Sequence, residues 1–381
     1  MHLYSLPLLK PGAITSAAYG NFSSPHATEF CVARGNIIEV LRPSNSNDGL
    51  LESVVTQNTY GSIRSLSTIR LWGGDETDYI VMTSDSGAVT VLSLVDNQTD
   101  GCTLNVVSQT FFGKTGCRRV VPGQMLTCED SDNGGRVLMV AASEKQKLVF
   151  KVGKGDDGKF IISSALPVDK PRTITFDTVS IDVGTEHPEF VCLEINYGTV
   201  DDGEQKIENV EKMLSYYKMD LTLNNVVLTS SIPTIRSANR LISVPGGSSG
   251  PGGVIVLGEG EIQYYAPPGT SKKSSQNEIK VNIPCRSPTF GRKANSAITT
   301  TRLNLIVSFA SIAQREQKVF FCLVQTEEGD IFRINLICDD SNSQVNEIEM
   351  TYFDTIPVCS SMCISRNGLL FAASEFGDHT L

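Results

Sequence analysis

The chain has 381 residues, with 42 acidic and 32 basic side chains, and its formal net charge at pH 7 is −10. Such a charge argues against a protein whose main work is to coat nucleic acid, because that binding rests on a basic surface. The hydrophobic fraction of 40% is ample for a folded core. No apolar run approaches the roughly 20 residues that span a bilayer. Composition therefore favours a protein that meets other proteins and predicts no membrane contact.

In chain order, a strand–turn–strand unit recurs about seven times. Six copies read CVARGNIIEVL from Cys31, YIVMTSDSGAVTVLSL from Tyr79, VLMVAASEKQKLVFKV from Val137, GVIVLGEGEIQYYA from Gly253, FFCLVQTEEGDIFRINL from Phe320 and LLFAASEFGDHTL from Leu369. A looser copy runs from Phe190 to Asp220 with a polar insert at its tip. The turns fall near Gly35, Ser86, Glu144, Thr199, Glu259, Glu328 and Phe376. This spacing exceeds a single hairpin and is typical of one four-stranded sheet per repeat.

The repeat predicts an all-β fold, a seven-bladed β-propeller that occupies residues 1–381 as a single domain. Several strands are apolar on both faces, and a strand of that kind lies between two packed sheets. Blades stacked around an axis provide such packing and leave only short edges. The last copy ends at Leu381, a few residues into its second strand. We therefore expect the seventh blade to be incomplete.

Ten cysteines are spread along the chain, and several stand inside apolar strands, as Cys31, Cys192 and Cys322 do. A buried thiol behaves as a small hydrophobic group. The spacings form no disulfide framework, which favours a reducing compartment, the cytosol or the nucleus.

Three formal matches to catalytic or metal-binding motifs fail when their surroundings are considered. The G-x-G-x-x-G match at residues 153–158 and the G-x-S-x-G match at residues 246–250 are each followed by a β run. Both motifs need a helix at that place. Cys359 and Cys363 have no second ligand pair at zinc spacing and are expected on one face of a strand. The sequence predicts no catalytic residue, no metal site and no cofactor.

One basic segment stands out in the acidic chain. FGKTGCRRVVPGQ, from Phe112, places Lys114, Arg118 and Arg119 close together beside two glycines. These side chains could pair with neighbouring carboxylates. Alternatively, they contact an acidic partner surface or a phosphate through the fork geometry of arginine. Composition does not choose between the two interpretations.

The same segment carries a resemblance to a known family. Further agreements, in order, are GNFS at Gly20, RGNIIEVLRP at Arg34, IRSL at Ile63, DYIVMTSDSG at Asp78, EKQKLV at Glu144, VPGGSSGPGGV at Val244, QTEEGDIF at Gln325, YFDTIP at Tyr352 and ASEFGDH at Ala373. Over its whole length the chain resembles the splicing factor 3b subunit 3 family, the large propeller subunits of the U2 small nuclear ribonucleoprotein. The wider family includes the large subunit of the cleavage and polyadenylation factor and the DNA damage-binding ubiquitin-ligase adaptor.

The resemblance implies the first of three propellers in a nuclear scaffold of pre-mRNA splicing. Its implied partners are the helical-repeat subunit and small subunits of splicing factor 3b, which secures the branch-site region. RNA contact is implied to be mostly indirect, in agreement with the acidic charge. Lys114, Arg118 and Arg119 are the expected partner contacts.

Two other classes of function stay open at this point. An enzyme could use the central channel of a propeller, but it would need convergent carboxylates, a histidine or a metal there. The four histidines do not recur at one position of the repeat. The nearer alternative is an adaptor subunit of a ubiquitin ligase or of the cleavage and polyadenylation machinery.

Overall fold

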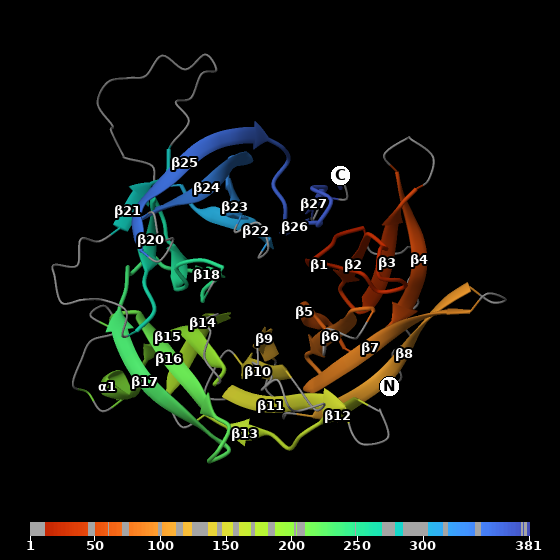
Figure 1. The fold of residues 1–381 in the computed structure, drawn as a ribbon, viewed down its shortest axis with the longest axis horizontal. Helices are drawn as coiled ribbons and strands as arrows, with labels where there is room; N and C mark the ends of the chain where they lie inside the picture. Colours follow the sequence, from red (N-terminus) through yellow and green to blue (C-terminus); the bar gives the residue numbers. More distant parts are fainter. Residues whose placement is uncertain are drawn as a thin grey trace, which may run out of the picture.

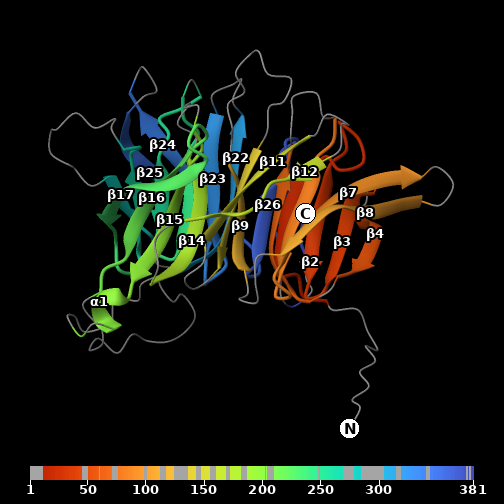
Figure 2. The ribbon, with the colours of Figure 1, turned by 90° about the horizontal axis from the view of Figure 1, so that it is seen from below.

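The computed structural model arranges the strands as a ring of sheets around a central axis (Figure 1). It describes residues 12–44, 50–59, 61–70, 76–97, 101–111, 117–123, 136–142, 147–154, 160–168, 172–181, 187–201, 203, 210–247, 249–268, 279–284, 304–314, 319–339, 344–374, 376 and 379–381. Figure 2 shows the strands running between the two flat faces of the ring.

Each of the first three blades is an antiparallel sheet built from consecutive strands. The first contains β1 (Ser16–Gly20), β2 (Glu29–Arg34), β3 (Ile37–Pro43) and β4 (Leu51–Asn58). The second contains β5 (Ile63–Ile69), β6 (Tyr79–Ser84), β7 (Ala88–Asn97) and β8 (Gly101–Phe111). The third contains β9 (Cys117–Gly123), β10 (Arg136–Ala142), β11 (Lys147–Lys154) and β12 (Phe160–Ile162), and β13 (Leu166–Pro167) also pairs with β11.

The next three blades repeat this plan. The fourth contains β14 (Thr173–Ile181), β15 (Glu189–Asn196), β16 (Met213–Asp220) and β17 (Asn225–Pro233), with the one-turn helix α1 (Gly198–Asp201) after β15. The fifth contains β18 (Arg240–Ser243), β19 (Val254–Leu257), β20 (Glu261–Tyr265) and β21 (Ile279–Asn282). The sixth contains β22 (Ile306–Gln314), β23 (Val319–Thr326), β24 (Asp330–Cys338) and β25 (Val345–Thr355). Within the described ranges no helix is long and apolar enough to cross a membrane.

The prediction of seven blades is wrong: among the described residues, six sheets have four or more strands. The remaining sheet consists of two four-residue strands, β26 (Ser361–Ile364) and β27 (Leu370–Ala373). The predicted hairpin at Phe376 is reduced to an isolated bridge between Ala372 and Thr380. The count failed because a hairpin motif records the two middle strands of a blade and carries no information about an outer partner.

Hydrophobic clusters fill every boundary between neighbouring sheets. Seven clusters draw their buried side chains from two adjacent sheets each, among the residues that the structure describes. The strand pair takes part on both sides: Met362 packs towards the sixth blade, and Phe371 stacks on Phe30 of the first blade at 5.0 Å between ring centroids. The expected face-to-face packing of strands is thereby confirmed, with β26 and β27 closing the ring.

Polar side chains of inner strands reinforce three of these boundaries. The Oγ of Ser65 accepts a hydrogen bond from the backbone of Val120 at 3.0 Å, and an Oδ of Asp177 accepts one from Leu241 at 2.9 Å. Ser361 accepts one from Ala17 at 3.1 Å. In each pair the acceptor stands on an inner strand and the donor on the inner strand of the next sheet. Each bond satisfies a buried or partly buried amide, and this ties neighbouring blades together.

Candidate interaction site

The ring presents two faces with different connections. We call one the hairpin face: it carries the turns between second and third strands and the links from an outer strand to the next inner strand. In the first blade these two kinds of segment are hydrogen-bonded, because the backbone of Ile63 donates to Gly35 at 2.8 Å. In the sixth blade, Ile356 donates to Gly329 at 3.1 Å in the same way. The opposite, loop face carries the links between first and second and between third and fourth strands.

The predicted basic segment reaches the inner strand of the third blade at the hairpin face. Lys114 lies outside the described residues. Arg118 and Arg119 lie at the start of β9, and a register shift against β10 leaves Arg118 as an extra residue, a β-bulge. For these two arginines only the backbone is described. Bulges re-aim side chains and often stand at functional positions.

The second blade offers a direct parallel to Arg118. A register shift between Ile63 and Ser65 makes Arg64 the extra residue of β5. Its guanidinium lies 3.4 Å from a carboxylate oxygen of Asp85, which stands on the neighbouring hairpin turn. Both side chains are well exposed, and such pairs contribute only about 0–1 kcal/mol. An arginine at this position is therefore held only weakly by its local carboxylate. Both interpretations of the basic segment, local pairing and contact with a partner, stay open.

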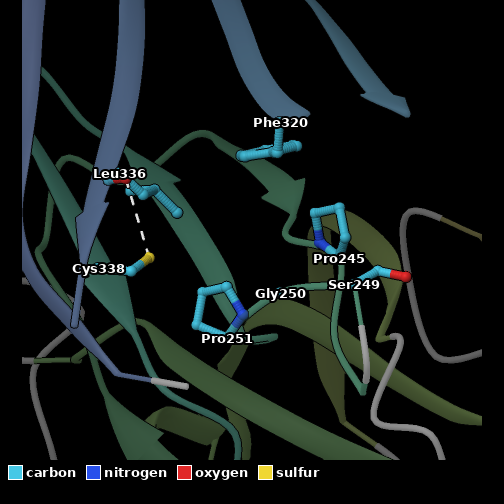
Figure 3. Close-up of a pocket in the computed structure, with 7 residues that line it drawn as sticks. All are labelled: Pro245, Ser249, Gly250, Pro251, Phe320, Leu336 and Cys338. Atoms are coloured by element: carbon cyan, nitrogen blue, oxygen red, sulfur yellow. Dashed lines mark hydrogen bonds between the residues drawn. The ribbon is translucent and has the colours of Figure 1, made fainter. Parts of the chain in front are cut away.

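A glycine-rich loop forms a small pocket on the loop face (Figure 3). The loop joins β18 to the antiparallel strand β19, which confirms that the G-x-S-x-G match is a hairpin connection. Its residues Pro245, Gly250 and Pro251 face Phe320 and Leu336 of the sixth blade. The pocket encloses about 50 Å³, whereas sites for small molecules usually have roughly 300–1,000 Å³. It is too small for a cofactor.

Glycine conformation and hydrogen bonds fix the backbone of this loop. Gly253 has a φ of +88°, and a Cβ atom there would lie 2.3 Å from the carbonyl oxygen of Tyr265. The hydroxyl of Tyr264 donates to the carbonyl of Gly252 at 2.8 Å, and the amide of Gly252 donates to Pro245 at 2.8 Å. Only glycine adopts such a conformation at no steric cost.

The second glycine motif is also a hairpin. Gly153 and Lys154 end β11, which pairs with β12 in an antiparallel register. No helix N-terminus follows among the described residues, so the pattern lacks the phosphate-binding amides that a dinucleotide site requires.

A buried polar cluster lies between the third and fourth blades. The Nζ of Lys147 contacts Glu194 at 2.9 Å and donates to the hydroxyl of Thr173 at 2.8 Å. The Tyr217 hydroxyl donates to the same carboxylate at 3.0 Å. Burial, followed by the nearby Glu194 charge, raises the pKa of Tyr217. Lys147 and Glu194 are at most 2% exposed, so no substrate reaches them, and the cluster is a structural tie between blades.

The described cysteines are also structural groups of the core. All seven cysteines whose side chains the structure describes are free thiols. Burial raises the pKa of Cys192 and of Cys322 to about 12. Cys359 and Cys363 were expected on one strand face, yet Cys359 packs towards the sixth blade and Cys363 towards the first. No group of three or more metal-binding side chains occurs in the described part of the chain.

The sequence profile described as "RSE1/DDB1/CPSF1 first beta-propeller" matches residues 13–381. The chain belongs to this first-propeller family. The membership agrees with the ring of sheets and with the resemblance carried by the sequence motifs.

Members of the first-propeller family with curated names are similar along the entire chain. Splicing factor 3B subunit 3 of Danio rerio is 39% identical over 383 residues, and that of Drosophila melanogaster is 38% identical. Pre-mRNA-splicing factor RSE1 of Mycosarcoma maydis is 37% identical over 390 residues. All three alignments cover 100% of this chain but only 29–30% of each relative. The chain thus spans less than a third of the length of these relatives.

Within this first propeller, sequence reasoning missed an exposed pair of aromatic side chains. Tyr352 and Phe353 are 58% and 56% exposed at the end of the outer strand β25. The motif YFDTIP that contains them contributed only to the resemblance. The sequence does contain a signal for this exposure, because two adjacent aromatics stand just before an Asp-Thr-x-Pro strand end. Successive side chains of a strand point to opposite faces, so in a half-buried strand one of the two must be exposed.

Proposed function

We propose that this propeller is a non-catalytic protein-binding scaffold of the nuclear pre-mRNA splicing machinery, the first propeller of a longer subunit in a splicing factor 3b complex. The observation that carries the proposal is the alignment of the complete chain, at 37–39% identity, with relatives named as splicing factors. The proposed partners are the helical-repeat subunit and small subunits of that complex, and the proposed RNA contact is indirect.

Physical features of the ring support a scaffold. Its titratable groups with strongly raised pKa values are core thiols and tyrosines, which burial keeps uncharged. Catalytic sites instead combine such shifts with an accessible pocket and convergent partners. Rigid blades with loops on two faces suit the holding of several proteins at fixed positions.

Affinity purification from nuclear extract tests the proposal. The tagged chain, or the full-length subunit that contains it, is expected to enrich splicing factor 3b subunits and U2 small nuclear RNA, identified by mass spectrometry and RNA sequencing. Enrichment of ubiquitin-ligase or cleavage-factor subunits, without splicing proteins, would assign the propeller to another branch of its family.

The basic segment has its own test. We propose Lys114, Arg118 and Arg119 as partner contacts, and reversal of all three charges should weaken association with the helical-repeat subunit. Each lost hydrogen bond to a charged group costs roughly 1.5–3 kcal/mol, so a loss of about tenfold or more in affinity is expected. Arg236→Glu is the matched control, because Arg236 is exposed on the equivalent face between the fourth and fifth blades. Unchanged affinity in the triple variant would remove these residues from the interface.

A further inference from the structure

An apolar strip crosses the hairpin face beside the sixth blade. We define the strip as residues 352–358, which lead from the outer strand β25 at the rim to the inner strand β26 (Figure 1). Its large side chains are open to solvent: Tyr352 is 58% exposed, Phe353 56% and Val358 39%. Contiguous exposed apolar side chains on a soluble protein mark interaction sites more often than single ones do.

The backbone of the strip is held by one buried side chain. Gln325 is fully buried, and its Nε2 donates to the carbonyls of Ile356 at 3.2 Å and of Pro357 at 3.0 Å. Its Oε1 accepts from the amide of Cys359 at 2.8 Å. The amide of Ile356 is bonded in turn to Gly329. A segment fixed in this way loses little conformational entropy when a partner binds, which favours affinity.

A β-bulge sets the direction of the aromatic pair. Phe332 pairs with Tyr352 and Ile331 with Asp354, so Phe353 is an extra residue of β25. The ring of Tyr352 meets Phe332 edge-on at 6.0 Å, and its hydroxyl lies 2.8 Å from that of Thr355. Phe332 thus supports the Tyr352 ring on one side, while most of the surface of Tyr352 stays exposed. Phe353 follows Tyr352 as the extra residue, and residues 351–355 at this strand end are all exposed, so both aromatic rings are open to solvent.

The surroundings of the strip are mainly acidic, although the exposed Arg333 lies on the neighbouring strand β24 opposite Thr351 and packs over the Phe321 ring at 4.6 Å. Residues 319–332 and 344–360 contain no lysine or arginine. They carry Glu327, Glu328, Asp330, Glu347, Glu349 and Asp354. Of these, Glu327 and Asp354 are exposed on the turn and in the strip themselves. This charge repels phosphate groups, and it also repels an identical strip on a second copy of the chain, so it favours a cationic partner.

The equivalent link between the fourth and fifth blades lacks these features. Residues 234–239 read TIRSAN, in which Ile235 is only half-buried and Arg236 is exposed. No aromatic side chain stands there. The combination of aromatic and acidic side chains is therefore absent from this link, although the outer strand β8 of the second blade also ends in an exposed aromatic, Phe111, at 70%.

We propose that the strip and the adjoining Glu327–Gly329 turn form a docking surface for a partner-protein segment that carries arginine or lysine beside apolar side chains. Guanidinium or ammonium groups can lie over the Tyr352 and Phe353 rings and reach the carboxylates of Asp354 and Glu327. The inference rests on the proposed function only for the source of the segment, a protein of the splicing complex.

Photo-crosslinking tests the surface in the assembled complex. Benzoyl-phenylalanine replaces Phe353 in one sample and Leu223 in the control, since Leu223 is 71% exposed in the turn between β16 and β17. Crosslinked peptides are sequenced after purification from nuclear extract. The expected product joins position 353 to a protein segment with lysine or arginine within a few residues. No product above the Leu223 control, or a product with RNA or with an acidic segment, would overturn the inference.

The crosslinked segment, made as a synthetic peptide, then gives affinities by fluorescence anisotropy. Phe353→Ser and Asp354→Lys should each weaken binding about tenfold, as expected for central anchors of an interface. Leu223→Ser and Glu259→Lys are the controls, because Leu223 is exposed away from the strip and Glu259 is exposed in the fifth-blade turn that corresponds to Glu327–Gly329. Equal affinities for all four variants would contradict the surface. Copurification with splicing proteins but no product at position 353 refutes the surface alone. A basic product from another assembly refutes only the splicing role.

Discussion

The ammonium group of Lys147 lies 2.9 Å from the carboxylate of Glu194, and the two side chains belong to neighbouring blades. The two side chains are 2% and 0% exposed, so the ion pair is buried. Thr173 and Tyr217 supply further hydrogen bonds. A buried ion pair is tolerable only with such complete partnering, because the loss of hydration of each charge is costly. The third and fourth blades are thus joined by a contact that depends on both partners.

Lys147→Met should lower the free energy of unfolding by roughly 3–5 kcal/mol, because it leaves a buried carboxylate without its counter-charge. Urea denaturation at pH 7 measures the effect. The double variant Lys147→Met/Glu194→Leu should recover part of the loss. Lys218→Met is the control: its 4.0 Å contact with Glu189 is partly exposed, and such a pair contributes about 0–1 kcal/mol. A Lys147 variant no less stable than the Lys218 variant would contradict this interpretation.

Gln325→Leu should release the strip of residues 352–358. Each buried amide or carbonyl left without a partner costs roughly 1–3 kcal/mol, so the segment should open far more often. Hydrogen exchange read by mass spectrometry is expected to show faster exchange at Cys359, whose amide bonds to Gln325. Gln109→Leu, at an exposed site on β8, should leave that rate unchanged. Unaltered exchange at Cys359 in the Gln325 variant would show that other contacts hold the strip.

Gly253→Ala should destabilise the fifth blade. The residue combines a φ of +88° with a close approach to the carbonyl oxygen of Tyr265, which the new methyl group would meet at 2.3 Å. Backbone strain of this kind costs of order 1–3 kcal/mol. Gly12→Ala is the control, because no atom lies within 4 Å of the place that its methyl group would take. Thermal unfolding should show a lower midpoint for the first variant alone, and equal midpoints would refute the conformational argument.

Thiol reactivity should follow burial. The thiolate is the reactive species, and burial raises the pKa of Cys192 and Cys322 to about 12. At pH 8 these thiols are neutral, and their ionised fraction grows about tenfold per pH unit through pH 10 without a plateau. Iodoacetamide should therefore label the partly exposed Cys102 and Cys338 first. Labelling in guanidinium should remove the difference. Equal native rates for Cys192 and Cys102 would contradict the buried placement.

Sequence reasoning located the middle strands well and the ring's closure poorly. The predicted turns near Ser86 and Glu259 do join antiparallel strands, because Gly-rich turns between β-branched runs are a local signal. The sequence around Phe376 has the same turn pattern and predicted a seventh blade. A complete blade also needs outer strands, and a hairpin pattern carries no information about them. Alternation indicates that one of Tyr352 and Phe353 is exposed, but not that both are. Residues 351–355 at the end of the outer strand β25 are all exposed, and the openness of a whole strand end is a tertiary property that alternation along one strand does not predict.

The closing contacts of the ring join residues from opposite ends of the described chain. Ala17 donates to Ser361, 344 residues away, and Phe30 stacks on Phe371. As the ribosome releases the chain from its amino end, one face of the first blade stays uncovered until residues 361–373 have been synthesised. Contacts of such sequence separation form slowly, and the exposed apolar face is open to aggregation meanwhile.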